Sequence, residues 1–472
     1  MSTTVIGAGI GGLAAAHYIK KGSIKPIQIL EASERVGGWI NSKNYDEGFI
    51  FEAGPRTIRP RGIPGANTLE LIEEIGLSSD VVPISSAHVA ARNRMIFANG
   101  QLCLLPNSLS SIFKKSPPFS ESLANIILND LKKGVHKKLE DESIYDFVKR
   151  RFGQELADYA ISPMICGICA GNAKEISVNF LMKEIFAKEQ KYGGIIKGVL
   201  MSIIKGENKK PRNAIILQTL ANRAKNEYWS IYSLNGGLEK FPRKFADFLV
   251  KRDIKIKLQT PVEKITFHKD NVIELTSNGE TQSTDYVVSS IPSYQLANTI
   301  ESQHPILAKH LNSIPNVDVA VLNFQYNDPN LIKQPGFGVL VPPIENLPVL
   351  GIIFDSCCFS MPNHTVLTVM MGGHWFKKLF GDDPAPEKLV KIAQENIERI
   401  LGISAEPNMT KVNILRKCIP QYTIGHVKRV IAIRDYIKEN NLPLSVCGAS
   451  YDGVGVNDVI LSAREAAKAI WV

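Results

Sequence analysis

The sequence predicts an α/β fold in which a Rossmann-like domain is built from discontinuous pieces of the chain. An α+β domain with a mostly antiparallel sheet and a helical insertion complete it. Three observations support this prediction: a glycine-rich turn between a strand and a helix at the start, a basic helical stretch over residues 110–212, and a second glycine-rich turn before the last helix. The 472 residues are enough for two or three domains.

The first strand, turn and helix occupy residues 4–31, TVIGAGIGGLAAAHYIKKGSIKPIQILE. Gly7 permits a tight turn out of the strand, Gly9 lets a pyrophosphate approach the backbone, and Gly12 lets the helix pack on the strand. The N-terminus of the helix offers N–H groups and a partial positive charge to phosphates. The pattern predicts a dinucleotide site; the alternative is a turn that only connects a strand to a helix.

An acidic residue and a second pair of glycines follow the next strand. Glu31 lies 19 residues after the last glycine of the turn, where a carboxylate accepts hydrogen bonds from ribose hydroxyls and disfavours a 2′-phosphorylated cofactor. Flavoproteins similar to amine oxidases carry the segment E-x-x-x-R-x-G-G, which this chain matches at Glu31, Arg35, Gly37 and Gly38. We expect Arg35 to reach the pyrophosphate and the glycines to pass close to FAD; the alternative is a surface turn.

The formal charge of +9 is concentrated in one region. Residues 110–212 hold 18 Lys and Arg against 12 Asp and Glu. Segments 122–138 and 193–206 place apolar residues at helical spacing with Lys between them, which is typical of a helix on an anionic surface and also of an amphipathic helix packed on a core. Both alternatives stay open. The basic residues lack interleaved aromatics, so nucleic acid is not expected as a partner.

Cysteine and histidine spacing predicts no metal site. The Cys166-x-x-Cys169 pair lacks a second pair, so we expect free, buried thiols there, and packing roles for Cys357 and Cys358. The nine His residues show no H-E-x-x-H spacing. No apolar run reaches the roughly 18 residues of a membrane span. The chain opens directly into its first strand, so we expect no cleavable N-terminal presequence.

Several elements are predicted up to residue 105. Residues 47–54 alternate as a strand, and the turn Gly54, Pro55, Arg56 and Thr57 follows, which we expect beside the flavin ring. Residues 67–76 read as a helix with Asn67 as N-cap and Gly76 as its end. Asn99-Gly100 predicts a hairpin over residues 93–105. Arg94 opens that hairpin, either as an anion anchor or as a solvated strand residue.

Further strands and a final glycine-rich turn are predicted after residue 229. Residues 229–238 lead into a helix through Pro242, and Val262 lies in a T-P-V segment that we expect beside the adenine. A helix over residues 386–401, the turn at residues 448–458 and a helix over residues 459–471 end the chain. Because the last turn also precedes a helix, we expect both ends of the chain to bind one flavin. The predicted strands are 254–258, 262–268, 272–276, 286–291, 317–326, 366–371 and 443–446, with a hairpin of 335–341 and 349–354.

The chain resembles the protoporphyrinogen oxidases of the flavin monoamine oxidase superfamily, most closely the animal mitochondrial type. The resemblance covers nearly the whole chain. It is carried by ERVGGWI at 34–40, FEAGPRTIRP at 51–60, CGICAGNAKEIS at 166–177, WSIYSLNGGLEKFP at 229–242, GFGVLVP at 336–342, KCIPQYTIGH at 417–426 and GASYDGVGVNDVI at 448–460. The last segment is long and specific, whereas other flavin oxidases share only the glycines.

The resemblance implies site residues. No Cys precedes Tyr451, where related amine oxidases attach their flavin, so FAD is expected to be non-covalent. The implied FAD-binding residues are Gly7, Ala8, Gly9, Ile10, Gly11, Gly12, Glu31, Ala32, Arg35, Gly38, Trp39, Gly54, Pro55, Arg56, Thr57, Val262, Ala449, Val454, Gly455 and Val456. The implied substrate-binding residues are Arg94, Gly167, Ala170, Phe337, Leu340 and Met370. No catalytic residue and no general base is identified.

The resemblance also implies an activity and partners. Protoporphyrinogen IX would lose six electrons in three cycles of FAD and dioxygen, yielding protoporphyrin IX and hydrogen peroxide in the penultimate step of haem biosynthesis. The protein would lie peripherally on the inner mitochondrial membrane, on the intermembrane-space side, bound to an anionic surface through residues 110–212. A homodimer and contact with ferrochelatase are further expectations. The alternatives are another flavin amine oxidase or desaturase, and a non-catalytic flavin-binding partner protein.

The resemblance and the predicted elements together divide the chain into six segments. The FAD-binding domain comprises three of them, the substrate domain two, and the helical membrane-binding domain one. In chain order they are 1–88 (FAD), 89–109 (substrate), 110–212 (helical), 213–300 (FAD), 301–424 (substrate) and 425–472 (FAD).

Overall fold

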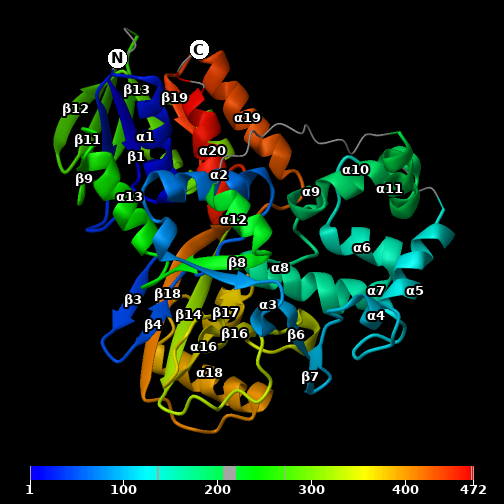
Figure 1. Ribbon diagram of the computed structural model, residues 1–472. Coiled ribbons are helices and arrows are strands. Elements are labelled where there is room, and N and C mark those ends of the chain that lie inside the picture. Colours follow the sequence, from blue (N-terminus) through cyan, green and yellow to red (C-terminus); the bar gives the residue numbers. More distant parts are fainter. Residues whose placement is uncertain (1, 135–137, 206–218, 270–271, 469, 471–472) are drawn as a thin grey trace. The chain divides into compact units, whose positions relative to one another are not determined.

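The computed structural model describes residues 2–134, 138–205, 219–269, 272–468 and 470. They form two compact units, each assembled from separate stretches of the chain (Figure 1). Unit 1 comprises Met1–Ser85, Gln218–Pro315 and Val427–Val472, and unit 2 comprises Ser86–Leu217 and Asn316–His426. Within the predicted helical region, residues 135–137 and 206–212 lie outside the described residues, as do the predicted helical positions 469 and 471 at the end of the chain.

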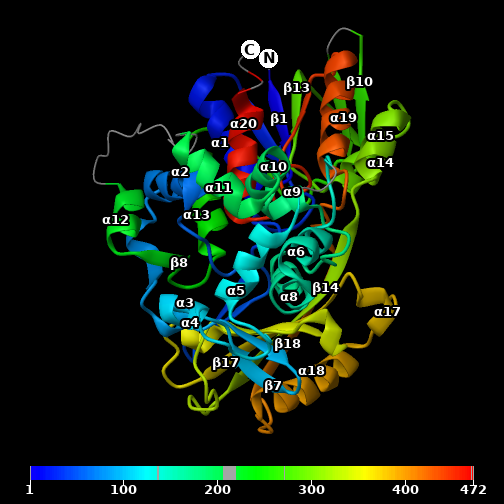
Figure 2. The same ribbon diagram turned by 90° about the vertical axis from the view of Figure 1, so that its right-hand side faces the viewer.

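Unit 1 contains a five-stranded parallel sheet, in the order β19-β13-β1-β2-β9. Its strands are β1 Thr3–Ile6, β2 Ile27–Leu30, β9 Lys255–Lys257, β13 Tyr286–Ser289 and β19 Leu444–Val446. Helices α1 Ile10–Gly22 and α20 Val456–Lys468 lie side by side on it (Figure 1, Figure 2). The first and last helices therefore share one apolar core with strands from three separate stretches, as the predicted Rossmann-like domain requires.

Smaller elements surround this sheet. A three-stranded antiparallel sheet follows β9, and two pairs, β3–β4 and β5–β8, lie elsewhere in unit 1. The strands are β3 Ser42–Tyr45, β4 Phe49–Glu52, β5 Val81–Ser85, β8 Trp229–Leu234, β10 Lys264–Phe267, β11 Ile273–Ser277 and β12 Glu280–Thr284. The helices are α2 Gly62–Glu74, η1 Ser78–Asp80, α12 Leu220–Asn226, α13 Lys240–Val250, α14 Ser293–Ile300, α15 Pro305–Asn312 and α19 His426–Glu439.

Unit 2 is built on a seven-stranded sheet in the order β18-β14-β17-β16-β15-β6-β7. Every neighbouring pair is antiparallel except β15 and β6, which are parallel. The predicted hairpin at Asn99-Gly100 forms, with positive φ at both residues. The strands are β6 Met95–Ala98, β7 Gln101–Leu104, β14 Asn316–Tyr326, β15 Gly338–Leu340, β16 Val349–Phe354, β17 Thr365–Gly373 and β18 Met409–Pro420.

Helices cover both faces of this sheet. Helix α18 Pro386–Leu401 packs its buried Leu389, Ala393 and Ile397 on one face, and α8 Ser162–Cys169 packs on the other. The predicted helical character of the region from residue 110 is confirmed for the described residues. The remaining helices are α3 Val89–Arg92, α4 Leu109–Ile112, α5 Leu123–Leu128, η2 Asn129–Lys132, α6 Ile144–Phe152, α7 Gln154–Leu156, η3 Ala157–Ile161, α9 Val178–Leu181, α10 Lys183–Tyr192, α11 Ile195–Ile204, η4 Pro343–Glu345, α16 Asp355–Cys358 and α17 Phe376–Phe380.

The start of the helix predicted over residues 67–76 was wrong, and the last helix begins at Val456, three residues before its predicted start. Asn67 is not an N-cap, because α2 begins five residues earlier, at Gly62. Pro64 lies in the first turn, where its missing N–H is not needed by the helix, so the proline does not end it. Asn67 is instead buried inside the helix, and its side-chain oxygen accepts hydrogen bonds from Tyr18 and Arg464. Gly76 ends the helix region as predicted, with φ of +79°.

All seven cysteines are free thiols, and Cys166 and Cys169 are buried as expected. Burial raises the pKa of both thiols to about 12, so neither is a reactive thiolate at neutral pH. Among the described residues, no helix combines the length and apolar character needed to cross a bilayer.

A buried histidine is part of the core of unit 1. The His17 ring on α1 packs edge-on against Phe245 of α13, and its Nε2 lies 3.3 Å from Glu74 Oε2 on α2. Burial lowers the pKa of His17 to about 4, while the Glu74 carboxylate opposes this shift and the Lys21 and Arg252 cations add to it. The folded protein therefore disfavours protonation of this ring.

Replacing His17 by Phe should reduce the acid sensitivity of the fold. Because the pKa of the folded state lies below that of the unfolded chain, unfolding takes up a proton, and stability falls as pH drops from about 6.5 to about 4. The loss is roughly 3 kcal/mol. Thermal unfolding at pH 7 and pH 4 measures it, with exposed His268→Phe as control. If stability falls with pH as steeply in His17→Phe as in the unmodified protein, His17 is not the source of the acid sensitivity.

Candidate functional site

The turn after β1 is shaped by close backbone approaches. A Cβ on Gly12 would lie 1.8 Å from the Gly7 carbonyl oxygen, and Gly7 itself has a φ of +98°. Both positions therefore require glycine. Helix α1 begins at Ile10 with Gly9 as its N-cap, and no side chain caps it. The N–H groups of its first turn are thus presented to a ligand with the positive end of the helix dipole.

Two glycine segments face each other beside this turn. Gly9 and Gly37 form an isolated parallel bridge, and the Gly37 N–H donates to the Ala8 carbonyl. A Cβ on Gly9 would meet only the Gly38 Cα, at 3.9 Å, and a Cβ on Gly38 would meet only the Gly9 Cα, at 3.3 Å. Each glycine thus leaves bare backbone at the helix N-terminus, and this opening fits the pyrophosphate of a dinucleotide.

Glu31 lies at the carboxyl end of β2 and joins three neighbouring segments. Its Oε2 accepts from the Ala8 N–H at 2.6 Å, and its Oε1 accepts from the Ser33 N–H and hydroxyl. Its backbone carbonyl accepts from Thr260 N, which brings the segment that leads to Val262 beside it. The acidic residue, the glycine turn and the predicted adenine-binding residue therefore come together within unit 1.

Arg35 holds its own loop. The guanidinium donates to the carbonyls of Val36 at 3.1 Å, Ile40 at 3.0 Å and Gly38 at 2.5 Å. These bonds shape the loop that presents Gly38 to the glycine turn. Contact between Arg35 and a pyrophosphate stays a prediction.

The 54–57 turn passes directly against the same loop. A Cβ on Gly54 would lie 2.0 Å from the Trp39 carbonyl oxygen, so only glycine fits there. Arg56 is buried, whereas Trp39 is 42% exposed. Of the other predicted residues here, Pro55 and Thr57 are half-buried and Ala32 is exposed.

The last glycine-rich turn joins the first one. A Cβ on Gly11 would stand 3.0 Å from the Val459 side chain and 3.9 Å from the Gly448 Cα. The predicted residues Ala449, Val454 and Gly455 lie in this last turn, and Val456 begins α20. Asn457 Nδ2 donates to the Arg59 carbonyl at 2.8 Å, which ties the last turn to the segment after residue 57. The two ends of the chain therefore meet at one place.

Sequence reasoning missed the side chains that support these turns. The Ser290 hydroxyl, just after β13, donates to the Ile6 and Gly7 carbonyls at 2.9 and 3.2 Å. Asp452 accepts from the Ser462 hydroxyl, which in turn accepts from the Gly448 N–H. The only sequence signal for Ser290 was the strand predicted over residues 286–291, which ends at the carboxyl edge of the sheet. The spacing of residues along the chain gave no signal for Asp452 or Ser462.

Burial controls the ionisable groups near the last turn. It raises the pKa of the Cys447 thiol to about 12 and raises the pKa of Tyr451 above its usual value. Burial also raises the pKa of Asp458 in the first turn of α20. The surroundings of this turn therefore disfavour charge. Among the described residues, no three His, Cys, Asp or Glu side chains gather as a metal site would need.

The predicted substrate residues lie in unit 2, where α8 crosses one face of the sheet. A Cβ on Gly167 would lie 2.8 Å from the Leu340 side chain, which places the exposed glycine of α8 directly over β15. The Arg94 guanidinium lies 4.7 Å from the centre of the Phe337 ring. Ala170 and Met370 belong to a single apolar cluster between α8 and the sheet.

The end of α8 is fixed by close contacts with β17. Ala170 adopts a left-handed conformation with φ of 51°, and its carbonyl accepts from the His374 N–H at 2.9 Å. A Cβ on Gly373 would lie 2.2 Å from the same carbonyl oxygen. Within unit 2 the structure thus brings Gly167 to Leu340, Arg94 to Phe337, and Ala170 to Met370.

Replacing Gly9 by Ala should abolish cofactor binding while leaving the protein folded. The added Cβ meets no protein atom closer than 3.9 Å, but it occupies the backbone surface that fits a pyrophosphate. The FAD content after reconstitution reports cofactor binding. Thermal unfolding of the flavin-free protein reports whether the fold is intact. Gly134→Ala, where nothing lies within 4 Å, is the matched control. Normal FAD content in Gly9→Ala would refute this placement.

Comparison with known proteins agrees with this geometry. A family model described as flavin containing amine oxidoreductase matches residues 10–471. The chain is 37% identical to the protoporphyrinogen oxidase of Homo sapiens, over 99% of this chain and 98% of that protein. It is 31% identical to the protoporphyrinogen oxidase of Schizosaccharomyces pombe, again over 99% and 98%.

A solved structure shows the same fold. A candidate protoporphyrinogen oxidase from Exiguobacterium sp. 255-15 superposes with a TM-score of 0.81 at 24% identity, covering 100% of this chain and 98% of the other. The opening at the first glycine turn fits the pyrophosphate of FAD, the flavin cofactor that this family implies. The chain therefore belongs to the flavin-containing amine oxidoreductase family, and it is similar over its whole length to protoporphyrinogen oxidases.

Proposed function

We propose that this protein oxidises protoporphyrinogen IX to protoporphyrin IX with non-covalently bound FAD and dioxygen. The observation that carries the proposal is the full-length similarity to curated protoporphyrinogen oxidases, at 37% identity to the human protein. The glycine site of unit 1 and the helix-covered sheet face of unit 2 supply the two binding surfaces that such a reaction needs. The reaction places the protein in the penultimate step of haem biosynthesis.

Bound FAD supplies the redox chemistry, accepting two electrons in each of three cycles and passing them to dioxygen to give hydrogen peroxide. The chain's own residues hold the cofactor. Backbone N–H groups at the start of α1 would hold the pyrophosphate, and the Glu31 carboxylate, which here accepts from Ala8 and Ser33, would accept from ribose hydroxyls. Val262 would lie against the adenine. The turn at residues 448–456 adds a second helix N-terminus, that of α20.

The face of unit 2 that bears α8 suits a flat, apolar macrocycle with acidic side groups. Leu340, Met370 and Ala170 provide apolar contacts, and Gly167 lets α8 pack directly on Leu340. Arg94 lies over the Phe337 ring, which holds its cation in one place. We assign Arg94 as the anchor of a propionate, because a guanidinium binds a carboxylate through paired hydrogen bonds.

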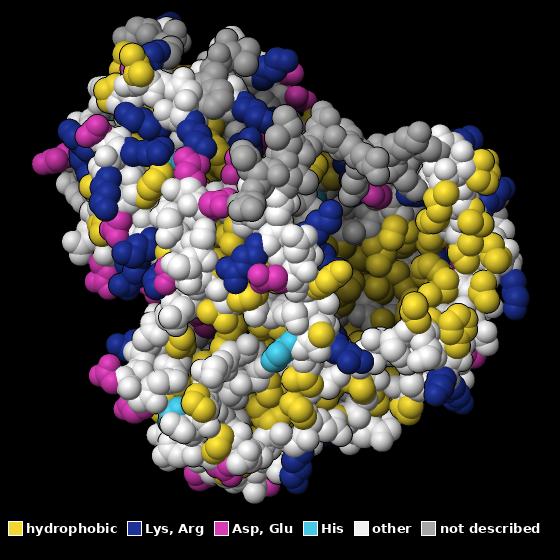
Figure 3. Space-filling model, viewed as in Figure 1, with side chains coloured by type: hydrophobic (Ala, Val, Ile, Leu, Met, Phe, Trp, Pro, Cys, Tyr) yellow, Lys and Arg dark blue, Asp and Glu magenta, His cyan; other side chains and the backbone are white. Residues whose placement is uncertain are grey.

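Exposed apolar residues of the helical region support contact with an anionic membrane surface. Figure 3 shows hydrophobic side chains gathered over this part of unit 2, with Lys and Arg at its edge. Among the described residues, the exposed apolar ones here are Leu109, Phe113, Ile127, Leu128, Leu131, Leu139, Ile168, Leu181, Ile185, Val199, Leu200, Ile203 and Ile204. Exposed Lys132, Lys191, Lys197 and Lys205 accompany them. Apolar side chains flanked by cations fit the boundary of an anionic bilayer.

Similarity to protoporphyrinogen oxidases also supports a cellular setting for this contact. The protein lies peripherally on the inner mitochondrial membrane, on the intermembrane-space side, as a homodimer. Its product, protoporphyrin IX, has a large apolar ring that partitions onto membranes, so transfer to ferrochelatase is favoured when both proteins are on the same membrane. Residues 110–212 form the membrane-binding part of this arrangement.

Replacing Arg94 by Ala should raise the KM for protoporphyrinogen IX by roughly ten- to a hundredfold, the equivalent of one charge-assisted hydrogen bond. The kcat should change less, because the anchor binds substrate and transition state alike. Steady-state kinetics with porphyrin fluorescence measures both constants. Arg92→Ala, two residues away and exposed, is the matched control. If Arg94→Ala has the same KM and kcat as the unmodified protein, Arg94 does not anchor the substrate.

Adding protoporphyrinogen IX without oxygen should bleach the oxidised flavin band at about 450 nm. Readmitting air should restore the band and yield fluorescent protoporphyrin IX. A flavin that stays oxidised would identify a non-catalytic binding protein. Reduction by a polyamine but not by the porphyrinogen would identify an amine oxidase instead.

Replacing both Leu200 and Ile203 by Glu should lower partition onto anionic vesicles by about tenfold or more, because two exposed apolar contacts are lost and two negative charges are added. Co-sedimentation with vesicles of phosphatidylcholine and phosphatidylglycerol measures this. Ile306→Glu, equally exposed but on α15 of unit 1, should bind as the unmodified protein does. Equal loss in both variants would argue against this surface.

A further inference from the structure

Helix α11 needs external support to keep its position. It spans only ten residues, and Leu200, Ile203 and Ile204 on its outer side are more than half exposed. A helix of this length is marginal in water by itself. Its N-cap, Gly194, provides no side chain to accept from the first N–H groups. The residues that hold α11 therefore have to come from its neighbours.

The neighbouring elements fix α11 at two points. A Cβ on Gly198 would lie 2.9 Å from the Lys188 carbonyl, so α11 packs closely against the backbone of α10. At the start of the helix, Asp130 Oδ2 accepts from the Ile196 N–H at 2.9 Å. Asp130, on η2, thus does for α11 what an N-cap side chain does in other helices, and its negative charge lies at the positive end of the helix dipole.

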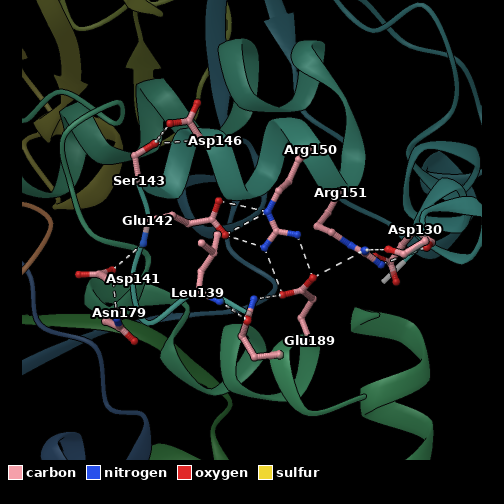
Figure 4. A network of polar contacts seen from close by, with 12 residues as sticks. Asp130, Leu139, Asp141, Glu142, Ser143, Asp146, Arg150, Arg151, Asn179 and Glu189 are labelled. Carbon is pink, nitrogen blue, oxygen red and sulfur yellow. Dashed lines mark hydrogen bonds and ion pairs between the residues drawn. The ribbon is translucent and has the colours of Figure 1, made fainter. Parts of the chain in front are cut away.

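Asp130 is itself held by a buried network of ion pairs (Figure 4). Arg151 Nε donates to Asp130 Oδ1 at 2.6 Å, and the Arg151 side chain is completely buried. Its Nη1 also lies 3.7 Å from Glu189 Oε1, and Arg150 donates to Glu189 and Glu142. Burial alone would raise the pKa of Glu189, but its hydrogen bonds with Arg150 outweigh this and hold the pKa below its usual value.

Burying charged side chains costs desolvation free energy, so this network adds little net stability. Its hydrogen bonds nevertheless fix the relative positions of the groups that they join. The Arg151–Asp130 pair lies directly under the turn between α10 and α11. A Cβ on Gly194 would stand 3.2 Å from Arg151 Nη2 and 3.6 Å from Asp130 Oδ2. The pair therefore determines where the turn lies and where the first N–H groups of α11 point.

We propose that Arg151 and Asp130 are positioning residues for α11, holding its first turn so that Leu200, Ile203 and Ile204 stay displayed toward an anionic lipid surface. The lipid contact rests on the proposed function, whereas the anchoring of α11 rests on the contacts of Asp130 alone. Removing the pair leaves the flavin site of unit 1 untouched. Its loss loosens the membrane-contacting helix without removing an apolar side chain from it.

The double substitution Asp130→Leu and Arg151→Met tests this proposal, because it removes both charges and leaves no buried ion without a partner. Amide hydrogen exchange over α11 in the absence of lipid should become about tenfold faster or more. Partition onto phosphatidylcholine–phosphatidylglycerol vesicles should fall by about tenfold. FAD content should stay at one per chain. The matched control is Asp318→Leu with Arg416→Met, an ion pair elsewhere in unit 2.

The outcomes separate the anchoring from the lipid contact. Unchanged exchange over α11 in the double variant would overturn the anchoring. Vesicle binding that survives both this variant and Leu200→Glu with Ile203→Glu would overturn the lipid contact, while faster exchange would still support the anchoring.

A second variant covers the case in which the double variant does not yield flavin-loaded protein. Gly194→Ala is unstrained at its extended φ of −172°, and its only tight contact would be with Arg151 Nη2, at 3.2 Å. It should also speed exchange over α11, and unaltered exchange there would overturn the proposal.

Discussion

The flavin site depends on one steric constraint: the backbone of the first helix packs against the strand that precedes it with no room for a side chain. A Cβ on Gly12 would overlap the Gly7 carbonyl oxygen, at 1.8 Å. This contact fixes where α1 begins and so where its uncapped N–H groups lie. The loop held by Arg35 and the turn that starts at Gly448 are then assembled around the same helix end.

Much of this arrangement was predictable because it is steric and local. Glycines at Gly7, Gly9 and Gly12, followed by an acid after the next strand, have few structural explanations, and the structure places them as expected. The prediction for Asn67 failed because a proline in a first turn looks like the start of a loop. Strand β18 was missed, since it lies at the edge of its sheet and most of its residues are only half-buried, which weakens the alternation.

Side-chain support between distant segments was not predictable from spacing. Ser290 holds the first glycine turn from a distant part of the chain and lies in no recognisable motif, and nothing in the spacing of the last turn marks the hydrogen bond between Ser462 and Asp452. The same applies to the ion network of the helical region, which the sequence presented only as an excess of positive charge. Arg151 and Asp130 are nearly completely buried, so in that pair the charge serves the internal geometry of the helices rather than the surface potential.

The central claim is that glycine turns from both ends of one chain form a single flavin site. The most direct test is the absorption spectrum of the purified protein after reconstitution with FAD and removal of free flavin. We expect one bound FAD per chain, released by denaturation because no covalent bond holds it, with a structured band at about 450 nm. A protein that remains colourless after reconstitution would contradict it.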